Sequence, residues 1–325
     1  MHLLVTGGAG YIGSHMVKLL LDSGHSAVVL DNFSTGHRDA VPCSDVIEGD
    51  IGDRGAIDRI FSAHRFDGVI HFASYIQVGE SMERPDRYYR NNVANTLTLL
   101  EAMHEHGAQN FIFSSSAAVF GEPEYVPIDE RHPKNPINPY GMSKLMVERM
   151  LSDVDHAYGL RSVALRYFNA AGADPDGLLG ERHDPETHLI PLVLQVAAGR
   201  RQAAKVFGRD YDTPDGTCIR DYVHVVDLCE AHLLALAYLR RGAPTAAINL
   251  GNGNGFSVQE VIDTARRVTG RAIKVEDAPR RLGDPARLVA DASRAREVLG
   301  WAPAYTKLER ILEDAWRWEL RQSSV

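Results

Sequence analysis

A glycine-rich turn near the amino terminus constrains the fold of this chain more than any other feature. The segment LLVTGGAGYIGSH (residues 3–15) places Gly7, Gly8, Gly10 and Gly13 after an apolar run and at the start of an amphipathic stretch. Gly8, Gly10 and Gly13 satisfy G-x-G-x-x-G, in which glycine permits positive φ and lets a pyrophosphate approach the backbone. The N–H groups and dipole of a following helix favour an anion there. The turn therefore predicts a strand–turn–helix unit that binds a dinucleotide.

An acidic residue follows at the end of the next predicted strand. In VVLDNF, Asp31 stands about where a carboxylate accepts both adenosine ribose hydroxyls. A carboxylate disfavours a 2′-phosphate, so the pattern favours NAD over NADP. A simple turn at Asp31 and Asn32 is the alternative, but it leaves the complete strand–turn–helix–strand unit unexplained. Asp50 and Ile51 in EGDI, after the third strand, are placed to contact the adenine.

Short β-branched runs alternate with amphipathic stretches through the first half of the chain. Continuous apolar runs are typical of parallel strands buried on both faces, and their alternation with helices predicts a doubly wound α/β fold. The expected strands are 2–6, 26–31, 45–49, 68–72, 110–115, 162–167, 204–207 and 246–250. The expected helices are 11–22, 53–64, 86–107, 139–157, 189–199, 222–241, 257–269, 292–299 and 305–321.

The pattern changes after residue 168. The segment NAAGADPDGLLGERHDPETH is rich in Gly, Pro and Asp and predicts a long loop, whereas AAINL (246–250) predicts a strand that could rejoin the first sheet. We therefore expect a Rossmann-like, NAD-binding domain of residues 1–168 plus about 219–251. A smaller, discontinuous substrate domain would take residues 169–218 plus 252–325.

Charge and cysteine content limit the partners. The formal net charge of −8 argues against nucleic acid or an anionic membrane as the main partner. The three cysteines form no C-x-x-C pair, which fits a reducing compartment better than a disulfide framework. The amino terminus lacks the basic region and the long apolar run of a signal sequence. These features predict a cytoplasmic globular protein.

Two residues in INPYGMSKLMVERM (137–150) indicate the chemistry. Tyr140 and Lys144 are four positions apart on a predicted helix and therefore share a face. An ammonium and a nicotinamide cation would both favour phenolate, which would lower the pKa of the tyrosine. A phenolate beside a sugar hydroxyl is a general base that takes a proton while hydride leaves for NAD. Alone, the spacing is weak, because Tyr and Lys often occupy an apolar and a solvated helix position.

Three consecutive serines occur in IFSSSAAVFG (112–121), where a predicted strand ends. Open α/β sheets bind ligands at this edge, so one serine hydroxyl could hydrogen-bond a substrate oxygen. Any single serine there would more often satisfy loop backbone groups. Together with the glycine turn and the Tyr–Lys pair, the serines favour an active site.

Several segments together resemble the extended short-chain dehydrogenases/reductases, and among them the UDP-sugar 4-epimerases. They are TGGAGYIGSH, DN, GDI, HFAS, VGES, YYRNNV, FIFSSSAAVFG, PYGMSKLMVE, LRYFNAAGA and IRDYVHVVDL, and the resemblance runs from residue 1 to about 320. It implies reversible 4-epimerisation of a UDP-hexose (UDP-galactose/UDP-glucose) through a 4-keto intermediate, with NAD kept bound. Tyr140 would deprotonate the 4-hydroxyl, Ser116 would hold that oxygen, and Lys144 would bind the nicotinamide ribose.

The resemblance also implies the residues of both binding sites. Arg220 and Arg281 can each present a fork of donors to a diphosphate, which would let an acidic chain accommodate an anionic ligand. Helices 86–107 and 139–157 would form a four-helix bundle in a homodimer. The implied cofactor residues are Gly7, Gly10, Tyr11, Ile12, Gly13, Asp31, Asn32, Asp50, Ile51, Phe72, Ala73, Asn92, Ser114, Tyr140, Lys144 and Tyr167. The implied substrate residues are Ser116, Tyr140, Asn169, His188, Leu189, Phe207, Arg220, Arg281 and Asp284.

Three positions depart from patterns found in this family. Ile76 stands where some members carry a lysine near the cofactor, and His188 stands where some use asparagine against the substrate. Leu288 occupies the position that gates the sugar pocket, and its intermediate size leaves tolerance of N-acetylated sugars open.

Alternative activities on the same scaffold remain. A 4-epimerase of UDP-N-acetylhexosamines or UDP-pentoses and a UDP-glucuronate decarboxylase are compatible with these motifs. A 4,6-dehydratase needs an acid beside the serine, where this chain has Ala117 and Ala118. A non-catalytic NAD-sensing protein could dispense with Tyr140 and Lys144, which this chain keeps together with Ser116.

The loop RHDPETH (182–188) contains residue types that bind metals. His183, Asp184, Glu186 and His188 lack the H-x-x-x-H and H-E-x-x-H spacings, so we expect no metal. Thr187 as a helix cap and the acids as first-turn charges would account for the pattern.

Overall fold

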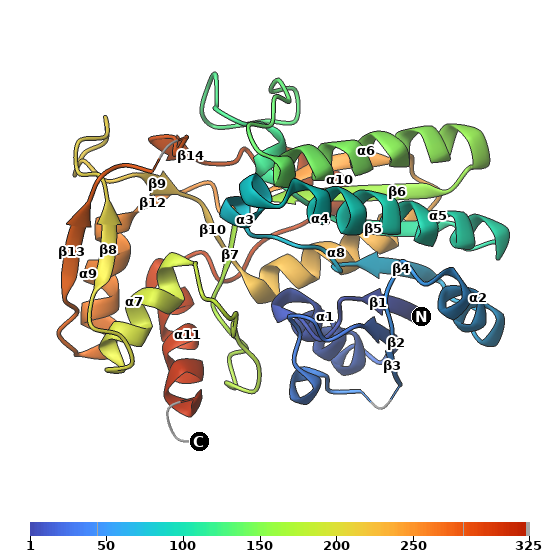
Figure 1. The fold of residues 1–325 in the computed structure, drawn as a ribbon, viewed down its shortest axis with the longest axis horizontal. Coiled ribbons are helices and arrows are strands. Elements are labelled where there is room, and N and C mark those ends of the chain that lie inside the picture. Colours follow the sequence, from blue (N-terminus) through green and yellow to red (C-terminus); the bar gives the residue numbers. More distant parts are fainter. Residues whose placement is uncertain (44, 282, 323–325) are drawn as a thin grey trace.

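The computed structural model describes residues 1–43, 45–281 and 283–322 and contains a central sheet beside a smaller α/β part (Figure 1). The sheet has seven parallel strands in the order β11-β6-β5-β4-β1-β2-β3. The order reverses at β1, as in a doubly wound Rossmann-like fold, so the predicted fold class is confirmed. The strands are β1 (His2–Thr6), β2 (Ser26–Asp31), β3 (Val46–Glu48), β4 (Gly68–His71), β5 (Asn110–Ser116), β6 (Arg161–Tyr167) and β11 (Ala246–Leu250).

Helices cover both faces of this sheet. Alternate residues of β1 enter opposite cores, with Leu3 and Val5 in one and Leu4 in the other. Both faces are buried, which is why the strands are continuous apolar runs. The first core is closed by α1 (Tyr11–Asp22), α8 (Val225–Arg240) and α10 (Ser293–Leu299), and the second by α2 (Arg54–Ala63), α5 (Asn95–Glu105) and α6 (Pro139–Tyr158).

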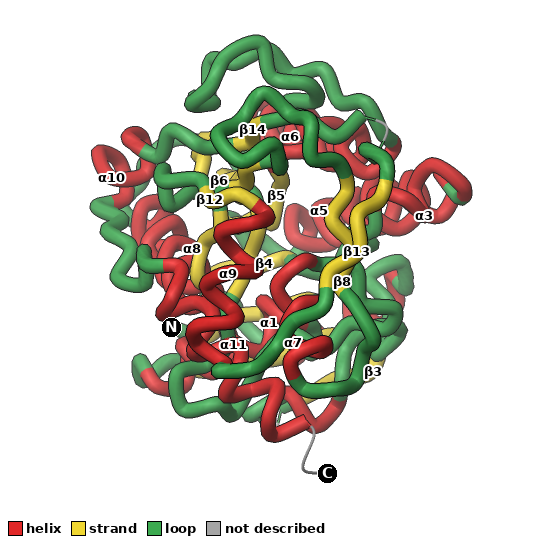
Figure 2. Tube along the Cα trace, turned by 90° about the vertical axis from the view of Figure 1, so that its left-hand side faces the viewer, coloured by secondary structure: helices red, strands yellow, loops and turns green. Residues whose placement is uncertain are grey.

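The smaller part has its own core. Ile190, Leu194, Val261, Ile262 and Ile311 are buried together between its helices. Figure 2 shows its strands β8 and β13 side by side, in the register that pairs them in parallel. Its elements are α7 (Leu189–Ala197), β8 (Ala204–Phe207), α9 (Val258–Thr269), β13 (Val275–Ala278) and α11 (Leu308–Gln322).

The capping box expected at the start of α9 is present. The Ser257 hydroxyl accepts the N–H of Glu260 at 3.0 Å, and the Glu260 carboxylate accepts the N–H of Ser257 at 2.7 Å.

One segment crosses the predicted domain division: Ala295, Leu299 and Trp301 are buried in the core of the large sheet. The domain boundaries remain a prediction. They assign residues 252–325 to the substrate domain, although these three side chains pack in the core of the large sheet.

Short strands join the two parts. They are β7 (Asn169–Ala171), β9 (Ile219–Arg220), β10 (Tyr222–His224), β12 (Phe256–Ser257) and β14 (Arg287–Leu288), in the pairs β10-β7 and β12-β9-β14. Strands of two or three residues are too short to show a period in the sequence, so they were not predicted as such.

Asp221, between β9 and β10, holds several crossing segments together. Its fully buried carboxylate accepts the N–H groups of Asn252 at 2.7 Å, Gly253 at 3.1 Å and Ala290 at 3.1 Å. Its carbonyl accepts the N–H of Asn169 at 3.1 Å. Burial raises the pKa of this carboxyl, while the three N–H groups oppose the rise.

The helix predicted over 86–107 is interrupted. It consists of α4 (Pro85–Tyr88), a π-helical turn (Tyr89–Ala94) and α5, and the short helix α3 (Val78–Glu83) precedes it. Two 3-10 turns, Arg38–Ala40 and Ala117–Val119, complete the helical elements. Within residues 1–43, 45–281 and 283–322, no helix is long and apolar enough to cross a membrane.

Candidate active site

The glycine turn is built so that side chains would not fit. Gly7 has φ +73°, and a Cβ there would lie 2.6 Å from the backbone nitrogen of Ala73. A Cβ on Gly13 would lie 2.1 Å from the carbonyl oxygen of Gly7. Gly10 is the N-cap of α1, and no side chain caps this helix. Its first N–H groups therefore suit a phosphate, and the glycines leave the backbone open to it.

The predicted ribose-binding carboxylate lies beside this turn. Asp31, only 8% exposed, accepts the N–H groups of Ala9 at 2.9 Å and Phe33 at 2.8 Å. The Asn32 amide donates to the Asp50 carboxylate at 2.8 Å, so the ends of β2 and β3 meet. The structure therefore brings Asp31, Asn32 and Asp50 together, with Ile51 buried next to Asp50.

Other predicted cofactor residues surround the turn. Ile12 and Phe72 pack against the first core, and the Phe72 ring lies 4.9 Å from that of His232. The Tyr11 hydroxyl donates to the carbonyl of Gly172 at 2.7 Å, which joins α1 to the loop after β7. Burial raises the pKa of Tyr11, and the nearby carboxylates add to the rise.

The start of α6 places Tyr140 against the end of β5. Asn138 caps the helix, since its side-chain oxygen accepts the N–H of Gly141 at 2.8 Å. A Cβ on Gly141 would lie 2.4 Å from the carbonyl oxygen of Ala118, so only glycine permits this approach. The close approach puts the Tyr140 hydroxyl within hydrogen-bonding reach of Ser116.

Lys144 lies one turn further along α6 and is 1% exposed. Its Nζ donates to Ser74 Oγ and to the carbonyl of Ser114, both at 2.8 Å, and lies 5.8 Å from the centre of the Tyr140 ring. Burial among these neutral partners lowers the pKa of Lys144 to about 7.

In the chain without cofactor, the pKa of Tyr140 is not lowered as the sequence pattern predicts. Burial raises the pKa of Tyr140, and the hydrogen bond with Ser116 only partly opposes this. Desolvation of the phenolate therefore outweighs the stabilisation that Ser116 supplies. The prediction that the pKa falls included the charge of a nicotinamide cation, and it requires that second charge.

Asn92, Ser114 and Tyr167 lie close to this pair. The hydroxyls of Ser114 and Tyr167 are hydrogen-bonded, and burial raises the pKa of Tyr167. Asn92 projects from the π-helical turn, where its amide donates to Ser143 Oγ at 3.1 Å and its oxygen accepts the N–H of Tyr75 at 2.9 Å. The extra residue of a π turn thus turns Asn92 toward α6, as such turns often do at functional sites.

Sequence reasoning missed residues that support the site. Glu148 accepts from the Ser115 hydroxyl at 2.6 Å and from Nε of Arg166 at 2.8 Å, which joins α6, β5 and β6. The spacing could have identified Glu148, because it follows Lys144 by four residues on the same helical face. No local pattern pointed to Ser74, which lies 70 positions from its partner Lys144.

The predicted substrate residues form several contacts beside the small strands. Arg220 donates to the carbonyl of Ile219 at 2.7 Å and pairs with Asp284, and the Arg281 guanidinium lies 3.9 Å from the centre of the Phe207 ring. The Asn169 amide donates to the carbonyl of Asp221 at 3.0 Å.

Two further positions lie at the edges of this region. Leu288 pairs in register with Arg220 and packs against the cluster of Val119, Phe120 and Ile128. Exposed Ile76 lies two residues before α3, at the position of the absent lysine.

The prediction for the start of α7 was wrong. The N-cap is His188 rather than Thr187, and the first turn contains no acidic residue. The Glu186 carboxylate accepts the N–H groups of Thr187 at 2.7 Å and His188 at 2.8 Å, just before the helix, and no side chain caps its first turn. Leu189 begins the helix and packs against the core of the smaller part.

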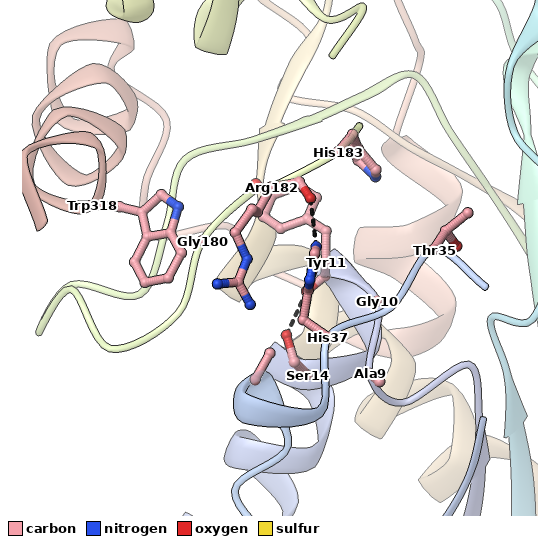
Figure 3. A pocket seen from close by; sticks show the side chains of 11 residues that line it. Ala9, Gly10, Tyr11, Ser14, Thr35, His37, Gly180, Arg182, His183 and Trp318 are labelled. Atoms are coloured by element: carbon pink, nitrogen blue, oxygen red, sulfur yellow. Dashed lines mark hydrogen bonds between the residues drawn. The ribbon is translucent and has the colours of Figure 1, made fainter. Parts of the chain in front are cut away.

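A pocket adjoins the glycine turn (Figure 3). The loop between β7 and α7 lies across this pocket. In that loop, the carbonyl of Arg182 hydrogen-bonds with His37 Nε2 at 2.8 Å, and the carbonyl of Glu181 accepts from Trp318 Nε1 at 3.1 Å. The lining residues are Ala9, Gly10, Tyr11, Ser14, Thr35, His37, Ala40, Gly180, Arg182, His183 and Trp318.

The sheet order and the glycine turn define the class of Rossmann-like dinucleotide-binding proteins. Residues 3–251 match the NAD dependent epimerase/dehydratase family. The chain belongs to this family.

Named relatives span nearly the whole chain. The UDP-glucose 4-epimerase of Halalkalibacterium halodurans is 54% identical over 318 residues, which are 98% of this chain and 95% of the relative. The structure of UDP-glucose 4-epimerase from Brucella ovis in complex with NAD is 52% identical with a TM-score of 0.95, and 97% of each chain is covered. The UDP-glucose-4-epimerase of Stenotrophomonas maltophila, with bound NAD and formylated UDP-arabinopyranose, is 39% identical with a TM-score of 0.97 and covers 100% and 99% of the chains.

Proposed function

We propose that this chain is an NAD-dependent 4-epimerase that interconverts UDP-galactose and UDP-glucose. The observation that carries the proposal is the placement of Tyr140 beside Ser116 and of Lys144 against Ser114 at the carboxyl end of β5. Open α/β sheets bind their ligands at this end. The family and the printed names of the relatives supply the class of reaction.

The chain's own residues fit NAD. Gly7 and Gly13 leave a cradle that a Cβ would fill, α1 offers its uncapped N-terminus to the pyrophosphate, and Asp31 offers a carboxylate to the ribose. Lys144 and Asn92 would lie toward the nicotinamide end. When bound, NAD would accept a hydride from C4 of the sugar and return it to the other face, and its oxidised ring would add positive charge beside Tyr140.

Proton transfer falls to Tyr140 and Ser116. The Tyr140 phenolate would take the proton of the sugar 4-hydroxyl and later return it. Ser116 Oγ accepts the N–H of Ala118 at 3.1 Å, and its own hydrogen would be donated to the sugar oxygen when substrate is bound. In its protonated form, Lys144 would add to the charge with which the cofactor cation favours phenolate. The 4-keto sugar would turn over in the pocket between the two transfers.

The nucleotide sugar would lie along the small strands. Arg220 and Arg281 would contact the diphosphate, with Phe207 and Asp284 holding their side chains as they do in the structure. Asn169, His188 and Leu189 remain proposed substrate contacts. Ala117 and Ala118 offer no acid to expel water, which disfavours a dehydratase.

A 4-epimerase of UDP-pentoses is the second candidate. One observation favours it: the Stenotrophomonas maltophila relative was solved with formylated UDP-arabinopyranose. Tolerance of N-acetylated sugars would depend on Leu288, which lies in register with Arg220 beside the proposed site.

The test is an assay of the purified protein with UDP-galactose and no added cofactor. UDP-glucose should form, and an NADH-like absorbance should appear during incubation with UDP-sugars. UDP-N-acetylgalactosamine and UDP-arabinose are assayed in parallel to rank the substrates. If UDP-galactose gives no UDP-glucose while UDP-arabinose is converted, the pentose reading replaces the hexose one. If no UDP-sugar is converted, the epimerase proposal fails.

A homodimer through α5 and α6 is part of the proposal. Tyr89 in the π-helical turn, Leu97 on α5 and Met146 on α6 are 36%, 41% and 40% exposed, which is high for large apolar side chains. Sedimentation should give a dimer, and Leu97→Glu should shift it toward monomer; a monomeric wild-type profile contradicts the idea.

We also infer a cytoplasmic location, which the free thiols of Cys43, Cys218 and Cys229 support.

A further inference from the structure

Four side chains of the loop between β7 and α7 converge on one point. They are Glu181, His183, Glu186 and His188, and their ligand atoms all lie within 4.8 Å of one another. His188 Nδ1 lies 2.7 Å from Glu181 Oε1 and 2.9 Å from Glu186 Oε1. His183 Nδ1 lies 3.0 Å from Glu181 Oε1 and 3.7 Å from Glu186 Oε2. Each imidazole thus faces both carboxylates through the same ring nitrogen.

These separations are of the size found between the ligands of one small metal ion. Zn²⁺ bonds to imidazole and carboxylate at about 2.0–2.2 Å, which puts neighbouring ligand atoms about 3.3–3.6 Å apart in a tetrahedron. The nitrogen–oxygen distances lie between 2.7 and 3.7 Å, with His188 facing Oε1 of Glu186 and His183 facing its Oε2. The two glutamate side chains are only 7% and 6% exposed, so water solvates them little.

Charge balance also favours a divalent ion. Two carboxylates carry two negative charges, which either two imidazolium protons or one dication can neutralise. The protonated arrangement puts two like charges on rings whose centres lie 5.1 Å apart. A dication instead takes the place of both protons and attracts all four groups.

We propose that Glu181, His183, Glu186 and His188 bind one divalent transition-metal ion, with Zn²⁺ the best match to two imidazoles and two carboxylates. Four protein ligands close a tetrahedral site, so the ion is structural rather than catalytic. It replaces the expectation of no metal, which rested on spacing within helical motifs. Here a loop, not a helix, brings the four residues together.

The position of the site gives the ion a role. The ring of His183 meets that of Tyr11 edge-on at 6.3 Å, and Tyr11 is the first residue of α1 after the glycine turn. On the other side, Nε1 of Trp318 in α11 donates to the carbonyl of Glu181 at 3.1 Å. The ion therefore fixes the loop between the glycine turn and the smaller part of the molecule.

The test uses tag-free protein with its resident cofactor, dialysed against EDTA and then against metal-free buffer. Added Zn²⁺ should bind at one ion per chain by elemental analysis, and Co²⁺ in its place should give the visible absorption of a tetrahedral complex. His183→Ala should weaken binding by more than about 100-fold, beyond the loss typical of outer-shell changes. His156→Ala, which removes an exposed histidine from α6, is the matched control and should bind as wild type does.

Three results would overturn the proposal. The first is no Co²⁺ or Zn²⁺ bound at equimolar metal, the second is unchanged binding in the His183→Ala variant, and the third comes from spectroscopy. X-ray absorption of the Zn²⁺-loaded wild type keeps the test independent of how the variant folds. It should show nitrogen and oxygen neighbours only, at about 2.0–2.2 Å. A sulfur neighbour would assign the ion to a cysteine and reject the loop site. Because the readouts are metal content and spectra, the proposed epimerase activity can fail without affecting them.

Discussion

Lys144 and the histidines of the 181–188 loop can all carry a positive charge, yet their surroundings differ. Lys144 donates to the neutral oxygens of Ser74 and Ser114, and burial lowers its pKa to about 7. Burial acts in the same direction on His183 and His188, but the carboxylates of Glu181 and Glu186 outweigh it. They raise the pKa of His183 to about 9 and that of His188 to about 10.

This difference in surroundings separates the proposed reactive site from the proposed structural one. A buried charge without a counter-charge costs free energy, and proteins place such groups where a ligand or reaction uses them. Lys144 lies where a cofactor and a phenolate are proposed. Without a metal, the protonated histidines balance the two carboxylates of the loop cluster, and a bound dication would take the place of their protons.

Tyr140→Phe should give the largest effect. It removes the proposed base while keeping the ring, so kcat should fall by about 10³-fold or more. The NAD content of the purified protein should not change, because the hydroxyl and not the fold is lost. Tyr158→Phe, an exposed tyrosine at the end of α6, is the control and should retain activity. Turnover of the Tyr140→Phe variant near the wild-type rate would exclude this side chain as the base.

The Lys144→Met variant tests how burying Lys144 without a counter-charge changes the free energy of unfolding as the pH rises. In the folded protein Lys144 has a pKa of about 7, whereas in the unfolded chain it has its ordinary pKa of 10.5. Between these two pH values the unfolded chain therefore binds one more proton than the folded protein. Stability supplied at this position therefore rises with pH, by at most about 1.4 kcal/mol per pH unit.

Urea unfolding at pH 7.5 and 9.5 measures this slope. The free energy of unfolding of the wild type, relative to Lys144→Met, should increase by about 2 kcal/mol between the two pH values. Lys205→Met, at an exposed position on β8, should show little such change. A flat difference for Lys144 would mean that its charge is compensated after all.

Glu186→Gln tests the balanced cluster in EDTA-treated protein. The carboxylate accepts from His188 and from two N–H groups, and an amide in its place turns a donor toward imidazolium. We expect a loss of about 2 kcal/mol in the free energy of unfolding. Glu48→Gln breaks an exposed pair with Arg38 and should cost under about 1 kcal/mol. Equal losses in the two variants would show that the cluster is no more stabilising than a surface pair.

Ser116→Ala should have the smallest effect on the proposed reaction. It removes one hydrogen bond to the sugar oxygen but leaves base and cofactor site in place, so kcat should fall by about 10-fold, roughly 1.4 kcal/mol. Ser152→Ala, exposed on α6, is the control. A loss as large as that of Tyr140→Phe would give Ser116 a share in the proton transfer itself.

The sequence contained most of the fold because its elements are long and their periods clear. The bounds of β1, β2, β8, β11 and α1 agree with the prediction to the residue. The π-helical turn could not be foreseen, because one extra residue in a helix leaves the apolar pattern nearly unchanged. The strands β9, β12 and β14 have two residues each, and only their partners from distant segments define them.

The residues of the candidate site also fall into two groups: those that local spacing predicts and those that only contacts between distant segments define. Gly7, Gly13, Asp31 and the Tyr–Lys pair follow from local spacing, and the structure places them as that spacing requires. Ser74 was missed because its contact with Lys144 depends on how β4 and α6 meet in space. The loop cluster was interpreted as helix capping, because spacing rules apply to helices and this loop follows none.

Asp221 has a consequence for how the proposed reaction proceeds. Its buried carboxylate binds the N–H groups of Asn252, Gly253 and Ala290, at points where the chain passes between the two parts. Opening the molecule like a hinge would strip these donors from a carboxylate that no solvent reaches. We therefore expect the protein to stay a rigid frame through each catalytic cycle. The half-rotation that presents both sides of the ketone must then be made by the sugar within that frame.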